Sequence, residues 1–582
     1  MHHAQALTVG GSGNADPVTA IAPPDTLAGG LAALRDELRT LRLDLDVPGA
    51  ERARLDRDEL AGQIDDYLLP RLSALDAPLL MVVGGSTGAG KSTLVNSLVG
   101  SVVSPAGVLR PTTRAPVLAC HPADLPWFED DRVLAGLART SGVPAAPGGL
   151  QLVSTDALPE GLALLDAPDI DSVLAENRAL ATQLLAAADS WLFVTTAARY
   201  ADAVPWDFLR TARERGTALS VVLNRVPSDA GGEVTPHLEA MLAEQGLAGT
   251  ELLVVPETRL EDELLPAGAL APVRTWLDSL AADAQARAAL IRRTLTGALD
   301  SLAPRVGAVQ RAAEDQLAAG AELGADVERA YARSLEEVED ALKSGSLLRG
   351  EVLARWHEVV GTGDLMRVLE SRIGRVRDRV RSLVTGKPTA GEEIEAAVET
   401  SLETVVHAAA DRAAERSVAA WRDRASGRRL LAAAPPGLDR APPKLLEESR
   451  TELRAWQGAV FELVSREAAG KRTTARLASL GVNGAGLTVM LAVFVQTGGL
   501  TGAEIAIAGG TSAVGQKVLE AIFGDQAVRE LAARARKDLL ERIERLLHGD
   551  AGRFQALLDP VLPAPEAPAR VRDALQAVQR AR

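Results

Sequence analysis

A run of eight residues near position 90 has the residue types and spacing that bind nucleotide phosphates. Residues 85–92 read GSTGAGKS, which matches the phosphate loop G-x-x-x-x-G-K-[ST] at every defined position. The glycines allow backbone N–H groups to surround a phosphate, and a helix that begins at the loop adds its positive dipole end. Lys91 is expected to neutralise the β- and γ-phosphates, and the Ser92 hydroxyl to bind Mg²⁺. The nucleotide-binding residues expected in this segment are Gly85, Ser86, Thr87, Gly88, Ala89, Gly90, Lys91, Ser92 and Thr93.

The residues on either side of the loop supply the context that the motif requires. Residues 79–83 are an apolar run that predicts a buried strand before the loop, and residues 93–98 predict a helix after it. A glycine-rich turn without a ligand is the alternative, and it does not account for the full match in this context. Nucleotide binding is therefore the first functional prediction.

A carboxyl group further along the chain is placed to complete a metal site. The apolar residues 162–165 predict another buried strand, which ends directly at Asp166. A carboxylate in this position takes the Walker B role and holds Mg²⁺ directly or through a water molecule. Ser92 and Asp166 are therefore expected to be metal ligands.

The segment before residue 118 resembles the first switch of dynamin-like GTPases. Residues 112–118 read TTRAPVL, and that family carries a Thr-Arg-x-Pro run at this place. The chain thus resembles a bacterial dynamin-like P-loop GTPase, a class related to the Era-like GTPases. The resemblance implies that Thr113 binds Mg²⁺ through its hydroxyl and holds the attacking water through its carbonyl, with Thr112 as second choice. It makes Lys91, Thr113 and Asp166 the expected catalytic residues, while a Pro-Thr turn without such a role is the alternative.

Two motifs depart from the family pattern. Asp169 stands where dynamin-like GTPases have the glycine of Asp-x-Pro-Gly, and its carboxylate would repel the γ-phosphate unless it turns away. Guanine is usually read by Asn-Lys-x-Asp, but the strand predicted at 219–223 ends in Asn224-Arg225, and Asp229 lies two residues beyond the expected carboxylate. Asn224 and Arg225 are still expected to bind nucleotide. GTP is therefore the leading nucleotide, with Mg²⁺ as its metal.

Hydrolysis also needs a group that stabilises charge in the transition state. Residue 170 is isoleucine and not the water-orienting glutamine of small GTPases. Arg110 and Arg114 are candidates for this role, in the same chain or across a contact between two copies.

The apolar pattern predicts two architectures in succession. Short apolar runs alternate with helical stretches between 78 and 262, which indicates an α/β fold with a mostly parallel sheet, here a P-loop GTPase domain. After residue 262 the strand signals end, and long amphipathic stretches predict an all-α stalk or bundle over 263–582. Residues 25–77 predict leading helices, and residues 1–24 predict a disordered tail.

One segment of the helical half could reach a lipid bilayer. Residues 477–495 carry no charge, and about 19 helical residues approach the ~30 Å of a hydrocarbon core. A turn follows, and 505–518 is again largely apolar, with basic residues outside the pair and none in the turn. The segment 477–518 predicts either a hairpin that inserts into lipid or a glycine-rich helix pair buried in a bundle.

Composition narrows the class of partner. The net charge of −15 argues against non-specific nucleic-acid binding, which needs a basic face. The single cysteine, Cys120, fits a reducing compartment, and no secretory signal is seen at the N-terminus. A cytoplasmic protein is expected, located at the inner face of the cell membrane if the hairpin binds lipid.

These observations lead to three functional hypotheses. The first is a GTP-hydrolysing dynamin-like protein that acts at the cytoplasmic membrane through residues 477–518 and forms homo- or hetero-oligomers through its GTPase heads. The second is a soluble regulatory GTPase whose helical half binds a protein partner. The third is a nucleotide-binding scaffold with negligible turnover, suggested by Asp169 and Pro227.

Overall fold

The computed structural model describes most of the chain in two compact units. The structure describes residues 26–104, 115–130, 132–134, 136–141, 148–169, 175–228, 231–344, 390–468 and 523–582. Unit 1 comprises Met1–Leu43, Gly49–Glu314 and Pro563–Arg582, and unit 2 comprises Asp44–Pro48 and Asp315–Leu562. The expected tail at 1–24, Thr112 and Thr113, and the apolar segment 477–518 lie outside the described residues.

Unit 1 contains an eight-stranded sheet with the order β3-β4-β2-β5-β1-β6-β7-β8. Neighbouring strands are parallel, except that β2 runs antiparallel to β5. The strands are β1 (Leu79–Gly85), β2 (Val117–Cys120), β3 (Ala138–Ser141), β4 (Gly149–Ser154), β5 (Leu162–Asp166), β6 (Ser190–Thr196), β7 (Ala218–Val226) and β8 (Glu251–Pro256). The predicted α/β fold class with a mostly parallel sheet is therefore confirmed.

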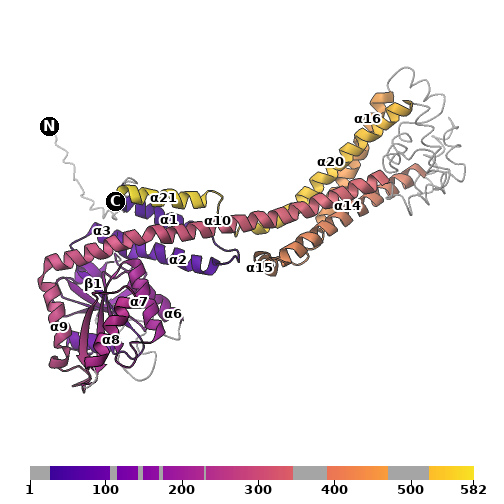
Figure 1. The fold of residues 1–582 in the computed structure, drawn as a ribbon. Coiled ribbons are helices and arrows are strands. Elements are labelled where there is room, and N and C mark those ends of the chain that lie inside the picture. The colour runs from indigo at the N-terminus through magenta and orange to yellow at the C-terminus, as the bar shows by residue number, and fades with distance from the viewer. Residues whose placement is uncertain are drawn as a thin grey trace, which may run out of the picture. The chain divides into compact units, whose positions relative to one another are not determined.

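Both faces of this sheet are buried, which explains the continuous apolar runs in its central strands. Alternate residues of β1 point to opposite faces, so Leu80 and Val82 join one core while Met81 joins the other. Helices α6 (Ala175–Ala186), α7 (Ala203–Arg215) and α8 (Gly231–Glu244) contribute to the first core. Helices α4 (Lys91–Val99) and α9 (Ala267–Ala282) contribute to the second, and the short α5 (Leu125–Glu129) adds Phe128 to the first. Figure 1 labels α6, α7, α8 and α9 around β1.

A third core in unit 1 joins the two ends of the described chain. It is formed by α1 (Leu27–Thr40), α2 (Ala50–Gln63), the π-helical turn η1 (Ile64–Leu68), α3 (Leu69–Ser73), the first part of α10 (Ala284–Ser344) and α21 (Ala567–Ala581). Gly30 of α1 lies so close to the backbone of Val578 that an added Cβ would be 3.2 Å from its nitrogen. Arg570 of α21 also forms an ion pair with Glu37 at 2.9 Å. Figure 1 shows α21 beside α1.

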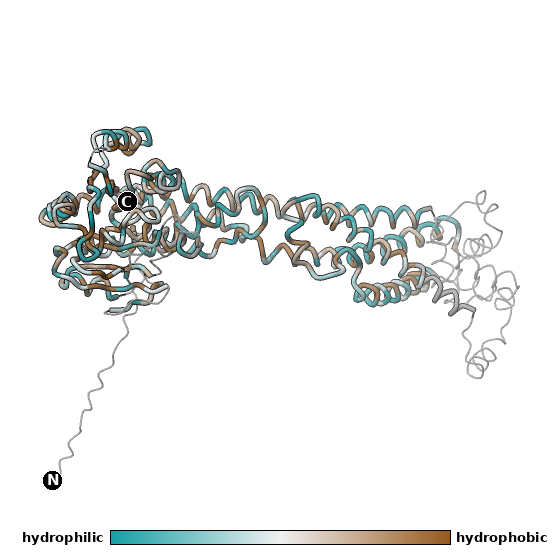
Figure 2. The backbone as a smooth tube through the Cα atoms, turned by 90° about the horizontal axis from the view of Figure 1, so that it is seen from below, coloured by the Kyte–Doolittle hydropathy of each residue, from teal (hydrophilic) through white to brown (hydrophobic). Residues whose placement is uncertain are grey.

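Within the described residues, the regular secondary structure of unit 2 is entirely helical. Its helices are the part of α10 from Asp315, α14 (Ala390–Arg422), α15 (Ala425–Ala433), α16 (Pro443–Ala468) and α20 (Asp525–Leu558). Trp421 and Trp456 are fully buried in its core, and their ring N–H groups donate to the carbonyls of Leu323 and Ala535 at 3.0 and 2.9 Å. Figure 2 shows apolar and polar positions alternating along these helices, as an amphipathic pattern requires. No helix in the described ranges is both long and apolar enough to cross a membrane.

One buried carboxyl group in unit 1 makes the stability of the fold depend on pH. Asp66 of η1 is 8% exposed and accepts a hydrogen bond of 3.3 Å from Gln183 of α6. Burial is the main cause that raises the pKa of Asp66 above its ordinary value of 3.8. Because the pKa of Asp66 is raised in the folded state, the ionised carboxylate lowers the stability of the protein at pH values above that pKa. At pH values below the pKa of the unfolded chain, the carboxyl group is protonated in both states and this loss is absent.

Replacing Asp66 with asparagine should therefore stabilise the protein at pH 7, because the amide keeps an acceptor for Gln183 and removes the buried charge. Urea unfolding at a series of pH values measures the difference between the two proteins. The stabilisation should shrink as the pH falls and vanish near pH 3.8. An advantage of the variant that stays constant over this range would contradict the prediction.

Candidate nucleotide-binding site

The phosphate loop lies at the carboxyl end of β1 and leads directly into α4. The chain pairs β1 with β5 on one side and with β6 on the other, so the loop opens at the point where the strand order reverses. In parallel α/β sheets, ligands bind in the crevice at this point. The topology therefore places residues 85–92 where a nucleotide would bind.

Two glycines of the loop have conformations that a side chain would prevent. Gly85 has φ 147°, and a Cβ there would lie 2.1 Å from the carbonyl oxygen of Val194. Gly90 has φ 95°, and a Cβ there would lie 2.5 Å from Nδ2 of Asn224. The motif glycines are thus required by the close approach of β6 and β7 as well as by the turn itself.

The lysine of the loop is almost fully buried, with 5% of its surface exposed. Its Nζ donates to the Ser86 carbonyl at 3.2 Å and forms an ion pair with the carboxylate of Asp169. An ammonium group held at the start of a helix and inside the loop is placed to attract phosphate oxygens.

Asp166 at the end of β5 is fully buried beside the loop. Its Oδ2 accepts hydrogen bonds from the Ser92 hydroxyl at 2.7 Å and from the Ser104 hydroxyl at 2.6 Å. Its Oδ1 is buried and receives no hydrogen bond from any described residue. Burial is the main cause that raises the pKa of Asp166, although the two serines and Lys91 act in the opposite direction.

These residues fit a magnesium ion. A buried carboxylate oxygen without a partner, next to a serine hydroxyl, supplies the hard oxygen ligands that Mg²⁺ prefers. Mg²⁺ in nucleotide sites is commonly held by one or two protein oxygens together with substrate phosphates. Ser92 and Asp166 would hold the ion, while Thr113, the third ligand expected from the sequence, lies outside the described residues.

Ser104 was not expected from the sequence, and it is positioned by Asn96 of α4. The Asn96 side chain accepts from the backbone N–H groups of Val103 and Ser104 at 3.0 and 2.9 Å and donates to the Ser104 carbonyl at 2.8 Å. This clamp aims the Ser104 hydroxyl at Asp166. No short motif signals the arrangement, because the serine and the aspartate are 62 residues apart.

The end of β7 contacts the loop through Asn224. Its Nδ2 donates to the Ala89 carbonyl at 2.9 Å, and its Oδ1 accepts from the backbone N–H of Arg225 at 2.9 Å. Arg225 has a left-handed backbone with φ 53°, which is uncommon for a residue with a Cβ and is often found at binding loops. Asp229, the carboxylate considered for base recognition, lies outside the described residues.

Arg199 is a further residue that the motifs did not indicate. It lies in the turn after β6, and its guanidinium donates to the Thr87 carbonyl at 2.7 Å while pairing with Asp202 at 2.9 Å. The contact brings a positive charge to the phosphate loop from a segment 112 residues away. Arg110 and Arg114, the arginines considered from the sequence, lie outside the described residues.

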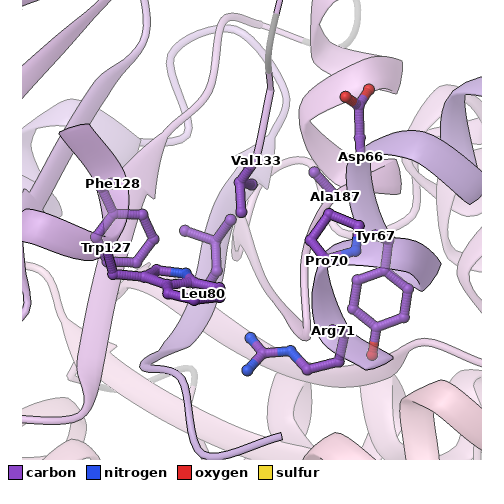
Figure 3. Close-up of a pocket in the computed structure, with 9 residues that line it drawn as sticks. All are labelled: Asp66, Tyr67, Pro70, Arg71, Leu80, Trp127, Phe128, Val133 and Ala187. Carbon is purple, nitrogen blue, oxygen red and sulfur yellow. The ribbon is translucent and has the colours of Figure 1, made fainter. Parts of the chain in front are cut away.

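A separate small cleft lies toward the opposite end of β1. Figure 3 shows Trp127 and Phe128 on one side and Tyr67 and Arg71 on the other, with Leu80 of β1 between them. Its volume of about 10 Å³ is close to the minimum for one water molecule. It is a packing junction between the leading helices and the sheet, and not a second ligand site.

Comparison with known proteins adds structural similarities at low sequence identity. No protein-family model matches this sequence, and the search of curated proteins finds no match. Among solved structures, the chain is similar to a member of an oligomerised bacterial dynamin pair described as sensing and tethering membranes, at 10% identity and a TM-score of 0.38, with 95% of each chain covered. It is also similar to LeoA, a bacterial dynamin GTPase from ETEC, at 12% identity and a TM-score of 0.25, covering 95% of this chain and 97% of that one. A structure of Era with MgGDPNP and a segment of 16S ribosomal RNA aligns at 21% identity and a TM-score of 0.23, covering 35% of this chain and 56% of Era.

Proposed function

We propose that this chain binds GTP together with Mg²⁺ and hydrolyses it to GDP and phosphate. The observation that supports this most directly is the convergence of Lys91, Ser92 and Asp166 at the carboxyl end of β1. There the lysine is buried in the loop and the serine donates to the aspartate at 2.7 Å. A buried cation beside a hard-oxygen metal site is the arrangement that phosphoryl transfer requires.

In this mechanism the chain positions the phosphates and stabilises charge. Backbone N–H groups of the loop and the start of α4 bind the β-phosphate, and Lys91 neutralises the charge that develops on the β–γ bridge as the γ-phosphoryl group leaves. Mg²⁺, when bound, supplies further charge neutralisation at the β- and γ-oxygens. Water attacks the γ-phosphorus, the bond to the bridging oxygen breaks, and GDP takes the electron pair. Thr113 is proposed to orient that water through its carbonyl, as the resemblance of its segment implies.

GTP is proposed as the nucleotide in preference to ATP because Asn224 and Arg225 stand at the first two positions of the base-reading motif. The side chain of Asn224 is proposed to hold the phosphate loop in place, which its hydrogen bond to the Ala89 carbonyl supports. Arg225 stands at the place of the lysine in the base-reading motif, and its left-handed backbone supports a role in a binding loop. Both residues are proposed to lie on the side of the loop where the base binds.

We further propose that the protein acts at the inner face of the cytoplasmic membrane. The sequence of residues 477–518 supports this, because a largely apolar segment, of which 477–495 carries no charge, favours contact with anionic lipid when basic residues flank it. Contact between the GTPase units of two copies would then be promoted on the membrane. The soluble regulatory GTPase and the scaffold with negligible turnover remain the alternatives to be separated by experiment.

Phosphate release by the purified chain, with GTP or ATP and with or without anionic liposomes, tests these proposals together. GTP is expected to be hydrolysed faster than ATP, and anionic liposomes are expected to increase the rate while zwitterionic liposomes do not. Leu491→Asp should reduce the effect of lipid, because a charge in an apolar segment opposes insertion, by about 2.5 to 3.5 kcal/mol at the centre of a spanning helix. Turnover indifferent to lipid would favour the soluble GTPase, and an absence of turnover with retained binding would favour the scaffold.

A further inference from the structure

The lysine needed by the phosphates already has an anionic partner within the chain. Asp169 forms an ion pair with Nζ of Lys91, and the two side chains are 17% and 4% exposed. The same Nζ donates to the carbonyl of Ser86 at 3.2 Å. The positive charge of the loop is thus compensated by a carboxylate, and an incoming phosphate must compete with that carboxylate.

The position of Asp169 concerns the terminal phosphate of a triphosphate in particular. Asp169 follows Asp166 by three residues, and Asp166 pairs in register with Val83 just before the phosphate loop. Asp169 and Asp166 both act electrostatically with Lys91, at the place where the lysine and a metal on Asp166 would together hold the γ-phosphate of a bound triphosphate. A carboxylate there faces a γ-phosphate as a like charge, whereas a diphosphate leaves the place beside Lys91 to the carboxylate.

We infer that Asp169 is a specificity-determining residue that lowers the affinity for nucleoside triphosphates relative to diphosphates. It acts as an internal anion that competes with the γ-phosphate for Lys91. This inference rests on the proposed nucleotide site. Although the β-phosphate of either nucleotide approaches Lys91, only the γ-phosphate takes the place of the Asp169 carboxylate, so this contact is where the protein distinguishes the two nucleotides.

Calorimetric titration of the full chain with Mg²⁺ and either GDP or the non-hydrolysable analogue GppNHp tests the inference. Asp169→Asn keeps the size of the side chain and removes its charge. The variant is expected to bind GppNHp at least about fivefold more tightly than the wild type and GDP less than about twofold more tightly, because only the triphosphate loses a like-charge neighbour. Asp156→Asn is the matched control: its carboxylate is 92% exposed in the connection between β4 and β5, so both affinities should stay unchanged.

The remaining outcomes separate this inference from the proposed function. Equal tightening for both nucleotides, or none, in Asp169→Asn would overturn the inference while leaving nucleotide binding intact. Asp169→Glu retains the charge and should keep the wild-type ratio of the two affinities; a ratio like that of Asp169→Asn would show that charge is not the cause. Wild-type protein that binds neither GDP nor GppNHp would overturn the proposed function itself.

Discussion

Replacing Lys91 with alanine should reduce GTP turnover by on the order of 10³-fold or more, because electrostatic stabilisation supplies most of the catalysis in phosphoryl transfer. The lysine is buried in the loop at 5% exposure, so bulk water and surface cations cannot take its place. The change also leaves the carboxylate of Asp169 without its cation, next to the phosphates. Phosphate release at saturating GTP and Mg²⁺ measures the loss.

A second lysine supplies the control for this experiment. Lys343 of α10 is 54% exposed and pairs with Glu339 one helical turn away, so Lys343→Ala removes a lysine without touching the loop. That variant should keep the wild-type rate. Turnover by Lys91→Ala within about tenfold of the wild type would contradict the assignment of the phosphate loop as the catalytic site.

Replacing Arg71 with alanine should destabilise unit 1 by about 3 to 5 kcal/mol, the typical cost of leaving one partner of a buried ion pair uncompensated. Arg71 of α3 pairs with Asp189, which directly precedes β6, and their side chains are 6% and 0% exposed. Asp189 also accepts from the backbone N–H of Leu80 at 2.8 Å, and Arg71 donates to the carbonyls of Ala77 and Pro78. The pair thus connects the leading helices to β1 and β6.

Urea unfolding of the variant and two companions checks this prediction. Arg210→Ala breaks a surface ion pair in which Arg210 is 52% and Asp207 62% exposed. This change should lower the free energy of unfolding by less than about 1 kcal/mol. The double variant Arg71→Ala with Asp189→Asn removes the buried charge as well and should recover part of the loss. An Arg71→Ala protein no less stable than Arg210→Ala would show that the buried pair contributes little to stability.

Asp166 and Asp189, the two fully buried aspartates at the ends of sheet strands, differ in which neighbouring groups balance their negative charge. Burial raises the pKa of both Asp166 and Asp189, but Asp189 has a guanidinium partner while Asp166 has only hydroxyls and the charge of Lys91 nearby. Asp189, which has a cation as its partner, has a structural role in holding the fold together. Each carboxylate has one buried oxygen that accepts no hydrogen bond from the described residues, so that feature does not separate them. Asp166 differs because it lacks a guanidinium partner and lies beside the Ser92 hydroxyl, which fits the metal-ligand role that the sequence predicts for it.

Much of the α/β fold could be predicted from local patterns. The strands β1, β5 and β6 are buried along their whole length and β7 along most of it, so their apolar runs are continuous and visible in the sequence. The edge strand β8 is also visible as an apolar run, although only Leu253 and Val255 of it are buried. The strands β2, β3 and β4 were not recognised: β2 and β3 have only four residues each, and β3 reads ARTS with no residue classed as buried. The strand β3 owes its pairing to its neighbour β4 and not to its own hydrophobicity, while β2 is buried but too short to stand out as a strand.

The phosphate loop was identifiable from the sequence because its chemistry is contained in eight consecutive residues and the strand and helix beside them. Backbone conformation and dipole are local properties, so a short motif carries them. Asp166 was found in the same way, from an apolar strand that ends in a carboxylate. Asp169 stood out only as a departure from the glycine of a known motif.

The hydrogen-bond partners of Asp166 and of the phosphate loop are determined by the pairing of strands that are far apart in the chain. The contacts of Asp166 with Ser104, of Thr87 with Arg199 and of Ala89 with Asn224 join residues 62, 112 and 135 positions apart. Likewise, Glu37 and Arg570 meet across 533 positions because α21 packs on α1. Sheet order and helix packing create these neighbours, and no periodicity within one segment encodes them. The motif thus sets which chemistry the loop can perform, while the fold selects the side chains that hold Asp166 in place and the carboxylate that competes for Lys91.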